Sequence, residues 1–480
     1  MNTIDRLANA ERPHNPFIYV MAIIVAFNGL LFGFDTGVVS GALLYIRESF
    51  HLSTVMQEAV VSSVLVGAMV GAFTGGNLAD RFGRRRLTIL GSIVFFVASI
   101  GMALSTNVYV LVGWRLIEGV AVGFASIVGT LYISEIAPSD IRGSLGFFQQ
   151  LMITIGILLA YVTNYVFAPT FLGVIGWRWM LGFGAVPAAV LGIGVYFMPE
   201  SPRWLINNGQ PEKAKQVLSR LRSHDELADE IEQIRSVSKA EQKGSLADLR
   251  EPWVRPALIV GIALAFIQQI TGINSVIYYA PTVLQGLGFS NVASIAGTVG
   301  VGIVNTTLTI VAILLADRVG RRPLLLVGTG GMALMLVILG GSFFVPGLAG
   351  VIGWITLISM ILYVAFFAIG LGPVYWLLIA EIYPLRIRGT AEGVASVFNW
   401  LANFLVALTF LSVVDTLGKG ISFWILGAFT ILGFIFIYEQ VPETMGRSLE
   451  EIEAELQDRA LVGGETTGAL PKSRDDIDRP

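Results

Sequence analysis

The chain has 480 residues, of which 54% are hydrophobic and 14% are charged, and its formal net charge is −3. A soluble domain carries roughly 25% charged residues, and one soluble core could not hide this much apolar surface from water. The composition therefore indicates a protein of the lipid bilayer. It excludes a disordered chain, which needs low hydrophobicity and high net charge.

Stretches of about 20 apolar residues, the length of a bilayer-spanning helix, recur along the chain. They fall near residues 17–46, 59–79, 87–106, 108–133, 144–168, 178–198, 257–282, 292–316, 324–345, 350–380, 390–413 and 421–440. Strands of a β-barrel would be shorter and would alternate in polarity. The predicted fold class is therefore an all-α membrane protein with twelve transmembrane helices. No cleavable signal peptide is expected, because the first apolar stretch is too long for one.

The distribution of Lys and Arg predicts the orientation. With twelve spans both termini lie on one side of the membrane, and only Arg47, Arg178 and Lys419 fall on the opposite side. Positive loops stay cytoplasmic. We therefore expect a multi-pass protein of the cell membrane with both termini in the cytoplasm.

A charged segment, 199–254, separates the two sets of six spans. Pro211–Arg222 and Asp225–Gln242 within it, and Ser448–Arg459 after the last span, have the apolar spacing of short amphipathic helices. The stretch Val462–Pro480 is rich in Gly, Thr and Asp and is expected to be disordered. The predicted domains are 1–198, a six-helix bundle; 199–254, a cytoplasmic helical linker; 255–441, a second bundle; and 442–480, a cytoplasmic helix with its tail.

Three motifs of the first half recur in the second half, in the same order and at nearly one offset. Leu78–Arg85 recurs as Leu315–Arg322, Ser134–Gly143 as Ala380–Gly389, and Pro199–Ser201 as Pro442–Thr444. Each half has an even number of spans, so both halves enter the membrane in the same orientation. This is a parallel repeat, as expected of two bundles that rock around a central site.

These motifs resemble those of the sugar porter family of the major facilitator superfamily, from Phe17 to Glu450. The most specific are the paired Asp-Arg-x-Gly-Arg-Arg loops, Pro199–Trp204, Gln268-Gln269 with Gly272-Ile273-Asn274, and Pro442-Glu443-Thr444-x-Gly446. The resemblance implies two six-helix bundles and transport by alternating access.

Two groups of charged residues fall at bilayer depth, where an ionisable group costs ~2.5–3.5 kcal/mol on insertion scales. Asp35 lies in the first span, and Arg115 and Glu118 lie one turn apart in the fourth. They could be structural, with Arg115 paired only to Glu118. In proton-coupled sugar porters, however, an Asp and an Arg at the positions of Asp35 and Arg115 form a proton switch, and passive relatives often lack the acid. The resemblance therefore favours symport with protons as the coupling ion. Asp35, Arg115 and Glu118 are the predicted proton-coupling residues, with Glu118 one turn from Arg115 as the residue that would orient it.

A neutral polyol needs amides and hydroxyls for its own hydroxyls and an aromatic face for its ring. Gly272 should loosen the seventh span, and Gly370-Leu371-Gly372-Pro373 should break the tenth. The resemblance points most strongly to Gln150, Gln268, Gln269, Asn274 and Trp376 as sugar contacts. Phe32, Tyr278, Asn305 and Asn399 are weaker candidates, because polar residues also join packed membrane helices. Ile157 replaces a Gln that xylose-binding members often carry, which puts xylose in doubt as the preferred substrate.

The short loops on the termini side carry a symmetric set of charges. Positive charge there fixes topology. Acids and bases in both halves could also bridge the halves when this side is shut and separate when it opens. We therefore expect a cytoplasmic gate formed by Asp80, Arg81, Arg85, Glu135, Arg142, Asp317, Arg318, Arg322, Glu381 and Arg388.

The favoured function is proton-coupled import of a monosaccharide or related polyol. A passive facilitator is the alternative, and a sugar-sensing receptor is disfavoured by the short tail after Val441. No enzyme is expected: the chain has no Cys, its three His lie in polar stretches, and no acid pair in the spans has metal-ligand spacing. We expect no cofactor, no metal and no nucleic-acid partner, and a monomer in the bilayer.

Overall fold

The computed structural model describes residues 15–138, 142–221, 249, 251, 254–383 and 387–447, without the side chains of 142–146, 317, 380 and 388. The predicted helices over 225–242 and 448–459 and the tail 462–480 lie outside this part of the chain. Within it, twelve helices or pairs of helices are long and apolar enough to cross a membrane, which confirms the predicted number of spans.

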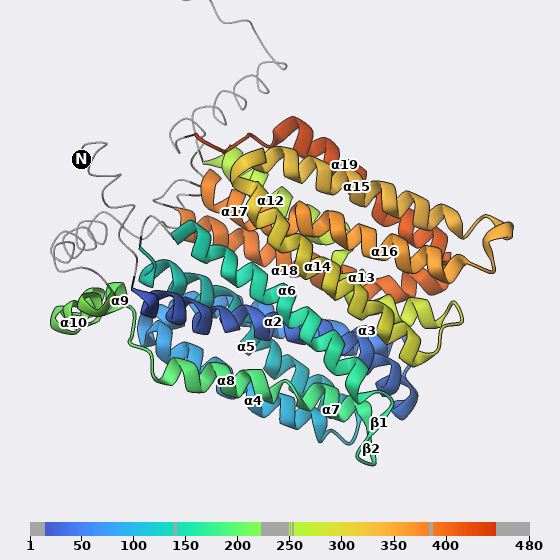
Figure 1. Cartoon of the computed structure of the whole chain (residues 1–480), viewed down its shortest axis with the longest axis horizontal. Coiled ribbons are helices and arrows are strands. Elements are labelled where there is room, and N and C mark those ends of the chain that lie inside the picture. Colours follow the sequence, from blue (N-terminus) through green and yellow to red (C-terminus); the bar gives the residue numbers. More distant parts are fainter. Residues whose placement is uncertain are drawn as a thin grey trace, which may run out of the picture.

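The first half contains six spans and a short hairpin (Figure 1). Its elements are α2 Pro16–Phe50, α3 Thr54–Phe82, α4 Arg84–Ala103, α5 Val108–Ile136, α6 Arg142–Phe167, β1 Thr170–Phe171, β2 Val174–Ile175, α7 Gly176–Gly182 and α8 Ala185–Tyr196. The antiparallel strands β1 and β2 were not predicted from the sequence. We call the end of the molecule that carries them the hairpin end.

The second half repeats this arrangement. Its elements are α12 Arg255–Ile270, α13 Ile273–Gln285, α14 Asn291–Val319, α15 Arg321–Ser342, η2 Pro346–Leu348, α16 Ile352–Ile369, α17 Leu371–Ile382, α18 Arg388–Leu417 and α19 Lys419–Gln440. Between the halves, α10 (Pro211–Leu221) confirms the first predicted linker helix, and α9 (Pro202–Asn207) precedes it. Both lie at the end opposite to β1 and β2, which we call the α10 end (Figure 1).

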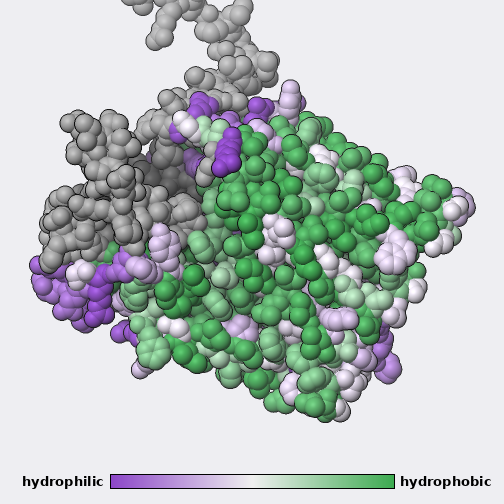
Figure 2. Space-filling model, in the orientation of Figure 1, coloured by the Kyte–Doolittle hydropathy of each residue, from purple (hydrophilic) through white to green (hydrophobic). Residues whose placement is uncertain are grey.

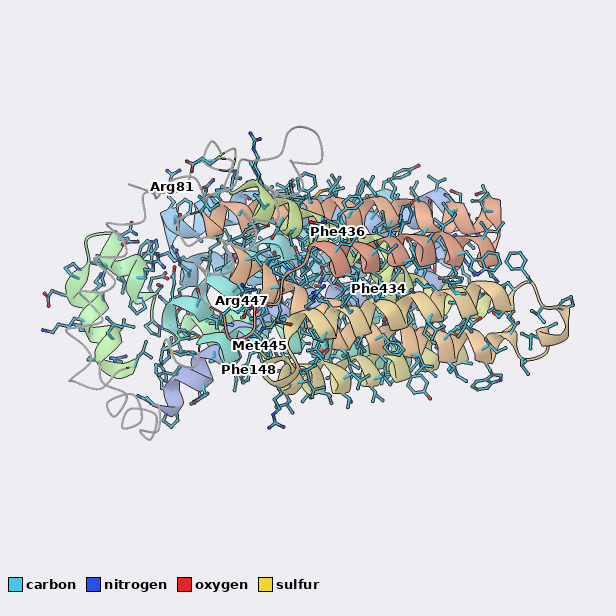
Figure 3. The ribbon with its side chains drawn as sticks, turned by 90° about the horizontal axis from the view of Figure 1, so that it is seen from above. Arg81, Phe148, Phe434, Phe436, Met445 and Arg447 are labelled. Atoms are coloured by element: carbon cyan, nitrogen blue, oxygen red, sulfur yellow. The ribbon has the colours of Figure 1, made fainter. Side chains whose placement is uncertain are left out.

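Apolar side chains cover the flank of the molecule, while hydrophilic ones gather mainly toward the α10 end (Figure 2). Viewed from above, the helices run lengthwise and Arg81 lies near the α10 end (Figure 3). Large apolar residues such as Phe73, Leu104 and Phe197 are more than two-thirds exposed. Such a surface is stable in lipid, where apolar groups need no burial, and would be costly in water.

Close packing of α2 on α6 holds the first half together. Gly29, Gly33, Gly37 and Gly41 recur every four residues along α2 and lie against α6. A Cβ at Gly33 would collide with the Ile153 carbonyl group. Small residues at this spacing let two membrane helices approach closely, which replaces the hydrophobic driving force that lipid does not supply.

The seventh and tenth spans are each broken in the middle, as the sequence predicts. Gly272 separates α12 from α13 at φ +88°, a left-handed conformation that favours glycine. Gly370 separates α16 from α17. Each break interrupts the helical hydrogen bonding of its span.

Candidate functional site

Four amide side chains from three helices meet beside the break in the seventh span. Gln269 donates to Asn399 Oδ1 at 3.0 Å and accepts from Asn274 Nδ2 at 2.8 Å. Asn399 donates to Gln268 Oε1 at 2.6 Å, and Gln268 Nε2 donates to the Leu371 carbonyl group, beside the break in the tenth span, at 3.0 Å. We call Gln268, Gln269, Asn274 and Asn399 the amide cluster. The structure thus brings together four of the predicted sugar contacts.

The amide cluster is held in place but is not fully enclosed. Gln268, Gln269 and Asn399 are buried, whereas Asn274 is half-buried. Trp376, on α17, is 36% exposed, with its ring centroid 4.8 Å from that of Tyr375. Amide groups suit the hydroxyls of a polyol, and an indole face suits its C–H side.

Phe32 contacts the opposite half of the protein. Its ring centroid lies 5.2 Å from that of Trp400 on α18, next to Asn399 of the amide cluster. Phe32 therefore brings the first span against α18, at the residue that follows Asn399. The sequence proposed Phe32 as an aromatic contact, and this position is compatible with that role.

The neighbouring amides of α6 face different partners. Gln149 points at α2, where it lies against Gly29, and neither atom of its amide has a hydrogen-bond partner among the described residues. Gln150 is half-buried and lies one turn from Thr154, whose carbonyl group accepts from Thr306 of the second half at 3.1 Å. Gln150 thus lies on the face of α6 that meets the other half, as its predicted role requires.

Asn305 and Tyr278 are both buried and lie outside the amide cluster. Asn305 Oδ1, on α14, has no partner among the described residues, which leaves it able to accept from a hydroxyl. Tyr278 receives a 3.5 Å contact from Asn403 Nδ2 and interacts electrostatically with Asp35 and Arg115 of the first half. Tyr278 therefore connects α13 with the charged residues of the first half.

Asp35, Arg115 and Glu118 form a buried charged group inside the first half, each at most 3% exposed. Arg115 Nη1 lies 3.4 Å from Asp35 Oδ1, and Arg115 Nε donates to the Val60 carbonyl group at 2.7 Å. Ser99 on α4 donates to Glu118 Oε1 at 3.2 Å. The hypothesis that Arg115 pairs only with Glu118 is wrong, because Asp35 is its ion-pair partner.

At the hairpin end, polar side chains tie the two halves together. The buried Glu58 carboxylate on α3 accepts from both the backbone N–H and the hydroxyl of Ser412 on α18, at 2.7 and 2.6 Å. Three further contacts join the halves there: Thr54 with Asp415 at 2.6 Å, Asn291 with Glu48 at 3.1 Å, and Arg47 with Gln285 at 3.0 Å. We call the Glu58–Ser412 contact the latch. The sequence did not single out Glu58.

At the α10 end, three ion pairs between described side chains each lie within one half. Arg84 pairs with Asp80 at 3.0 Å and with Glu135 at 2.8 Å. Arg321 pairs with Glu381 at 3.0 Å. The sequence proposed the acids of these pairs as gate residues but named the neighbouring arginines in place of Arg84 and Arg321.

The other proposed gate residues divide into three groups. Arg85 Nη2 and Arg322 Nη2 donate to the carbonyl groups of Tyr196 and Tyr438 in their own halves, and Arg81 and Arg318 are exposed. The side chains of Arg142, Asp317 and Arg388 lie outside the described set.

The repeated Pro-Glu-Ser/Thr motif places a Glu carboxylate at the start of a helix in each half. Glu200 Oε1 accepts from the backbone N–H groups of Arg84 and Arg85 at 2.9 and 3.1 Å, at the start of α4. Glu443 does the same at the start of α15, through Arg321 and Arg322. A carboxylate at a helix N-terminus satisfies free N–H groups and complements the helix dipole. The repeat shows the same Glu in both halves, but the sequence does not reveal which backbone groups it binds.

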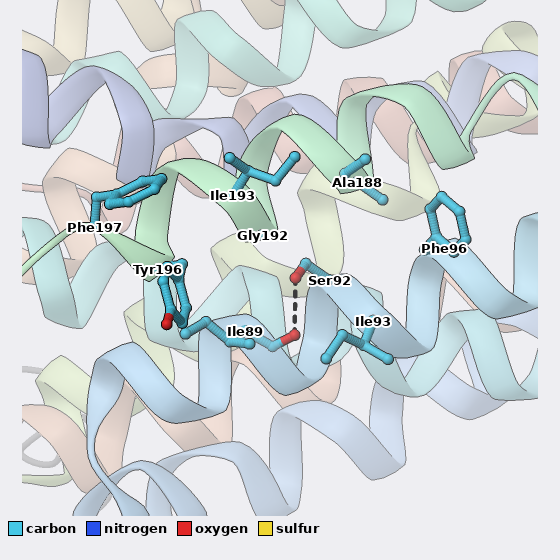
Figure 4. A pocket seen from close by; sticks show the side chains of 10 residues that line it. Ile89, Ser92, Ile93, Phe96, Ala188, Gly192, Ile193, Tyr196 and Phe197 are labelled. Carbon is cyan, nitrogen blue, oxygen red and sulfur yellow. Dashed lines mark hydrogen bonds between the residues drawn. The ribbon is translucent and has the colours of Figure 1, made fainter.

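An apolar groove of about 430 Å³ lies between α4 and α8 on the flank (Figure 4). Ile89, Ile93, Phe96, Ile193 and Phe197 are among its lining residues, and the Ser92 hydroxyl is already bonded to the Ile89 carbonyl group. Apart from the hydroxyls of Ser92 and Tyr196 the lining side chains are apolar, so the groove suits a polyol poorly.

Comparisons with known proteins agree with this geometry. The profile of the family described as "Sugar (and other) transporter" matches residues 21–456. The chain is 44% identical to "Putative metabolite transport protein YwtG" of Bacillus subtilis (strain 168), over 92% of this chain and 95% of that one. It is 42% identical to "Glucose transporter GlcP" of Staphylococcus epidermidis, over 92% and 98%.

Solved structures of the xylose transporter XylE from E. coli have the same fold. In a partially occluded inward open conformation, XylE superposes with a TM-score of 0.80 at 33% identity, over 90% of this chain and 100% of that one. The protein is described as a proton:xylose symporter in its complex with 6-bromo-6-deoxy-D-glucose, which gives a TM-score of 0.77 at 34% identity, over 92% and 100%. The family model and these relatives each cover most of the chain. The chain therefore belongs to the sugar transporter family of the major facilitator superfamily.

Proposed function

We propose that this protein carries a neutral monosaccharide or a related polyol across the membrane by alternating access, coupled to a proton. The amide cluster, with Trp376 on the helix whose Leu371 carbonyl group accepts from Gln268, is the observation that supports the substrate class most directly. It offers several donors and acceptors without a formal charge, which suits a molecule with many hydroxyls and no charge. GlcP and XylE, with glucose and xylose in their names, point to the same class.

Gln150, Asn305, Phe32 and Tyr278 complete the proposed site from around the cluster. Asn305 adds an unpaired acceptor, and Gln150 adds an amide on the face of α6 that meets the second half. The residue at position 157 is an apolar Ile that packs against Gly37. We therefore favour a hexose or an inositol over xylose.

Asp35 is the proposed proton carrier. A carboxylate beside a guanidinium stays ionised, and it takes up a proton when the pair separates in surroundings without water. The 3.4 Å separation of Asp35 from Arg115 is long for an ion pair, so a modest movement of α2 against α5 would break it. The proposed coupling ion is the proton, and transport needs no cofactor.

Contacts at the two ends suggest which state the structure represents. The latch and three further contacts join the halves at the hairpin end, and the three ion pairs described at the α10 end each lie within one half. We infer a state closed at the hairpin end. The proposed gate residues at the α10 end would then rearrange into contacts between halves when that end shuts.

The distribution of charge supports the orientation. By the order of the predicted spans, all but four of the 31 Lys and Arg residues fall on the same side as Arg81, which lies near the α10 end, and one of the four is the buried Arg115. Positive loops remain in the cytoplasm. We propose a monomer in the cell membrane with the α10 end and both termini in the cytoplasm.

Uptake into proteoliposomes tests the proposal. A panel of labelled sugars is offered to the purified protein with and without an inward pH gradient, beside Asp35→Asn. We expect at least one hexose or polyol to accumulate under the gradient. Asp35→Asn should lose accumulation and retain part of its counterflow, which needs no net proton movement. A wild type that equilibrates sugar but ignores the gradient would be a passive facilitator.

A further inference from the structure

Glu118 has features that its predicted role as a support for Arg115 does not explain. It is 2% exposed, and its Oε1 accepts one bond, from Ser99. Its Oε2 has no hydrogen-bond partner among the described residues, although it is fully buried. Burying an ionised carboxylate with one oxygen unsatisfied costs free energy, and a proton on the carboxyl group would remove that cost.

Arg115 cannot compensate both acids by its contacts. Its Nε is used by the Val60 carbonyl group, its Nη1 makes the single 3.4 Å contact with Asp35, and its Nη2 has no partner among the described residues. Glu118 interacts electrostatically with Asp35 as well as with Arg115. With both acids ionised, the buried group would carry a net charge of −1, and two carboxylates that interact with each other do not readily ionise together.

The surroundings offer no further charge to balance the group. Among the described residues, α4 contributes the Ser99 hydroxyl, α3 contributes the Val60 carbonyl group, and α13 contributes the neutral hydroxyl of Tyr278. The titratable and charged groups that face the two acids are therefore Arg115 and Tyr278. A single added proton makes the group neutral and gives Glu118 or Asp35 an O–H donor for the other carboxylate.

We propose that Asp35 and Glu118 form a carboxyl pair that holds the transported proton jointly, so that neither acid is the carrier alone. The proton is taken from water on one side, forms an O–H bond on one carboxyl group and a hydrogen bond to the other, and leaves to water on the opposite side. No other bond forms or breaks. This inference rests on the proposed proton coupling and extends it to a second residue.

Infrared difference spectroscopy of the reconstituted protein tests the pair, because a protonated carboxyl group has its own carbonyl-stretch band. The band is titrated against pH in wild type, Asp35→Asn and Glu118→Gln, and pH-driven sugar accumulation is measured on the same samples. If the pair shares the proton, each substitution removes the titrating carboxyl band and lowers accumulation at least tenfold. Glu212→Gln on α10, far from the pair, is the control and should behave as wild type.

Ser99→Ala provides a milder variant that keeps both acids. Losing its bond to Glu118 disfavours the ionised pair, so the midpoint of the band should move up by about one pH unit. Ser92→Ala, on the same helix, should not move it. A band and accumulation that persist in Glu118→Gln, or a midpoint unmoved in Ser99→Ala, would leave Asp35 as sole carrier and overturn the pair. A wild type that ignores pH gradients would instead refute proton coupling itself.

Discussion

The latch at the hairpin end gives the sharpest quantitative prediction. Glu58 is 2% exposed and accepts two hydrogen bonds from Ser412 of the other half. Hydrogen bonds to a charged group contribute ~1.5–3 kcal/mol each, and neutral ones ~0.5–1.5 kcal/mol. Glu58→Gln removes the charge and leaves one acceptor oxygen for two donors.

The change should therefore weaken the closed hairpin end by about 2 kcal/mol. When this end is open, residue 58 faces water and Gln costs little there. Since 1.4 kcal/mol is a factor of ten, the equilibrium should shift toward the open hairpin end by about 30-fold. Glu48→Gln is the matched control, because Glu48 is exposed and its contact with Asn291 should contribute only ~0–1 kcal/mol.

Distance measurements between spin labels can follow this shift. The sequence has no Cys, so Val55→Cys on α3 and Leu417→Cys on α18 provide two labelled sites at the hairpin end, and both positions are exposed. We expect Glu58→Gln to move the distance distribution to longer values and Glu48→Gln to leave it nearly unchanged. A distribution in Glu58→Gln that matches wild type would show that the latch does not hold the halves together.

Three further predictions concern the sugar site, the helix caps and the gate. Gln269→Ala leaves Asn274 Nδ2 and Asn399 Oδ1 unpaired and removes a hydrogen-bond partner of the sugar, at a cost of ~1–3 kcal/mol. Trp376→Ala removes the aromatic face for the sugar ring. Both variants should lose most sugar binding in calorimetry, and unchanged affinity in both would show that the site lies elsewhere. Glu443→Gln should lower the melting temperature in detergent, because Glu443 accepts from backbone N–H groups at the start of α15. The control Glu212→Gln, at an exposed position, should leave the melting temperature unchanged. Equal melting temperatures in the two variants would refute the capping role of Glu443. Arg142→Ala or Arg388→Ala should raise labelling from the cytoplasmic side if these residues close the gate, and unchanged or reduced labelling would argue against it.

The spans and the breaks in them could be predicted from the sequence because they depend on local chemistry. Twenty apolar residues identify a span wherever it packs, and Gly272 permits a left-handed conformation in any context. The amide cluster was also predictable in membership, since polar residues in an apolar helix are few. Its internal bonding was not, because the contact of Gln269 with Asn399 joins residues 130 positions apart.

The contacts that could not be predicted from the sequence depend on how helices face each other. In the run Arg84-Arg85-Arg86, only the structure shows that Arg84 turns inward to Glu135 while Arg86 is exposed. Glu58 looked like an acid near the start of a span, and its partner Ser412 lies 354 positions away. That contact also exists in only one conformational state, and a sequence pattern does not indicate in which state two residues meet.

The position of α13 suggests how sugar and proton could influence the same movement. Asn274 of the amide cluster and Tyr278 lie one turn apart on this helix, and Tyr278 interacts with Asp35 and Arg115. Tyr161 of the first half also donates to the Ile277 carbonyl group at 3.1 Å. Gly272, in a left-handed conformation, directly precedes this helix. A sugar bound at Asn274 and a proton bound near Asp35 would thus act on one short helix, and coupling between two ligands requires such a shared element.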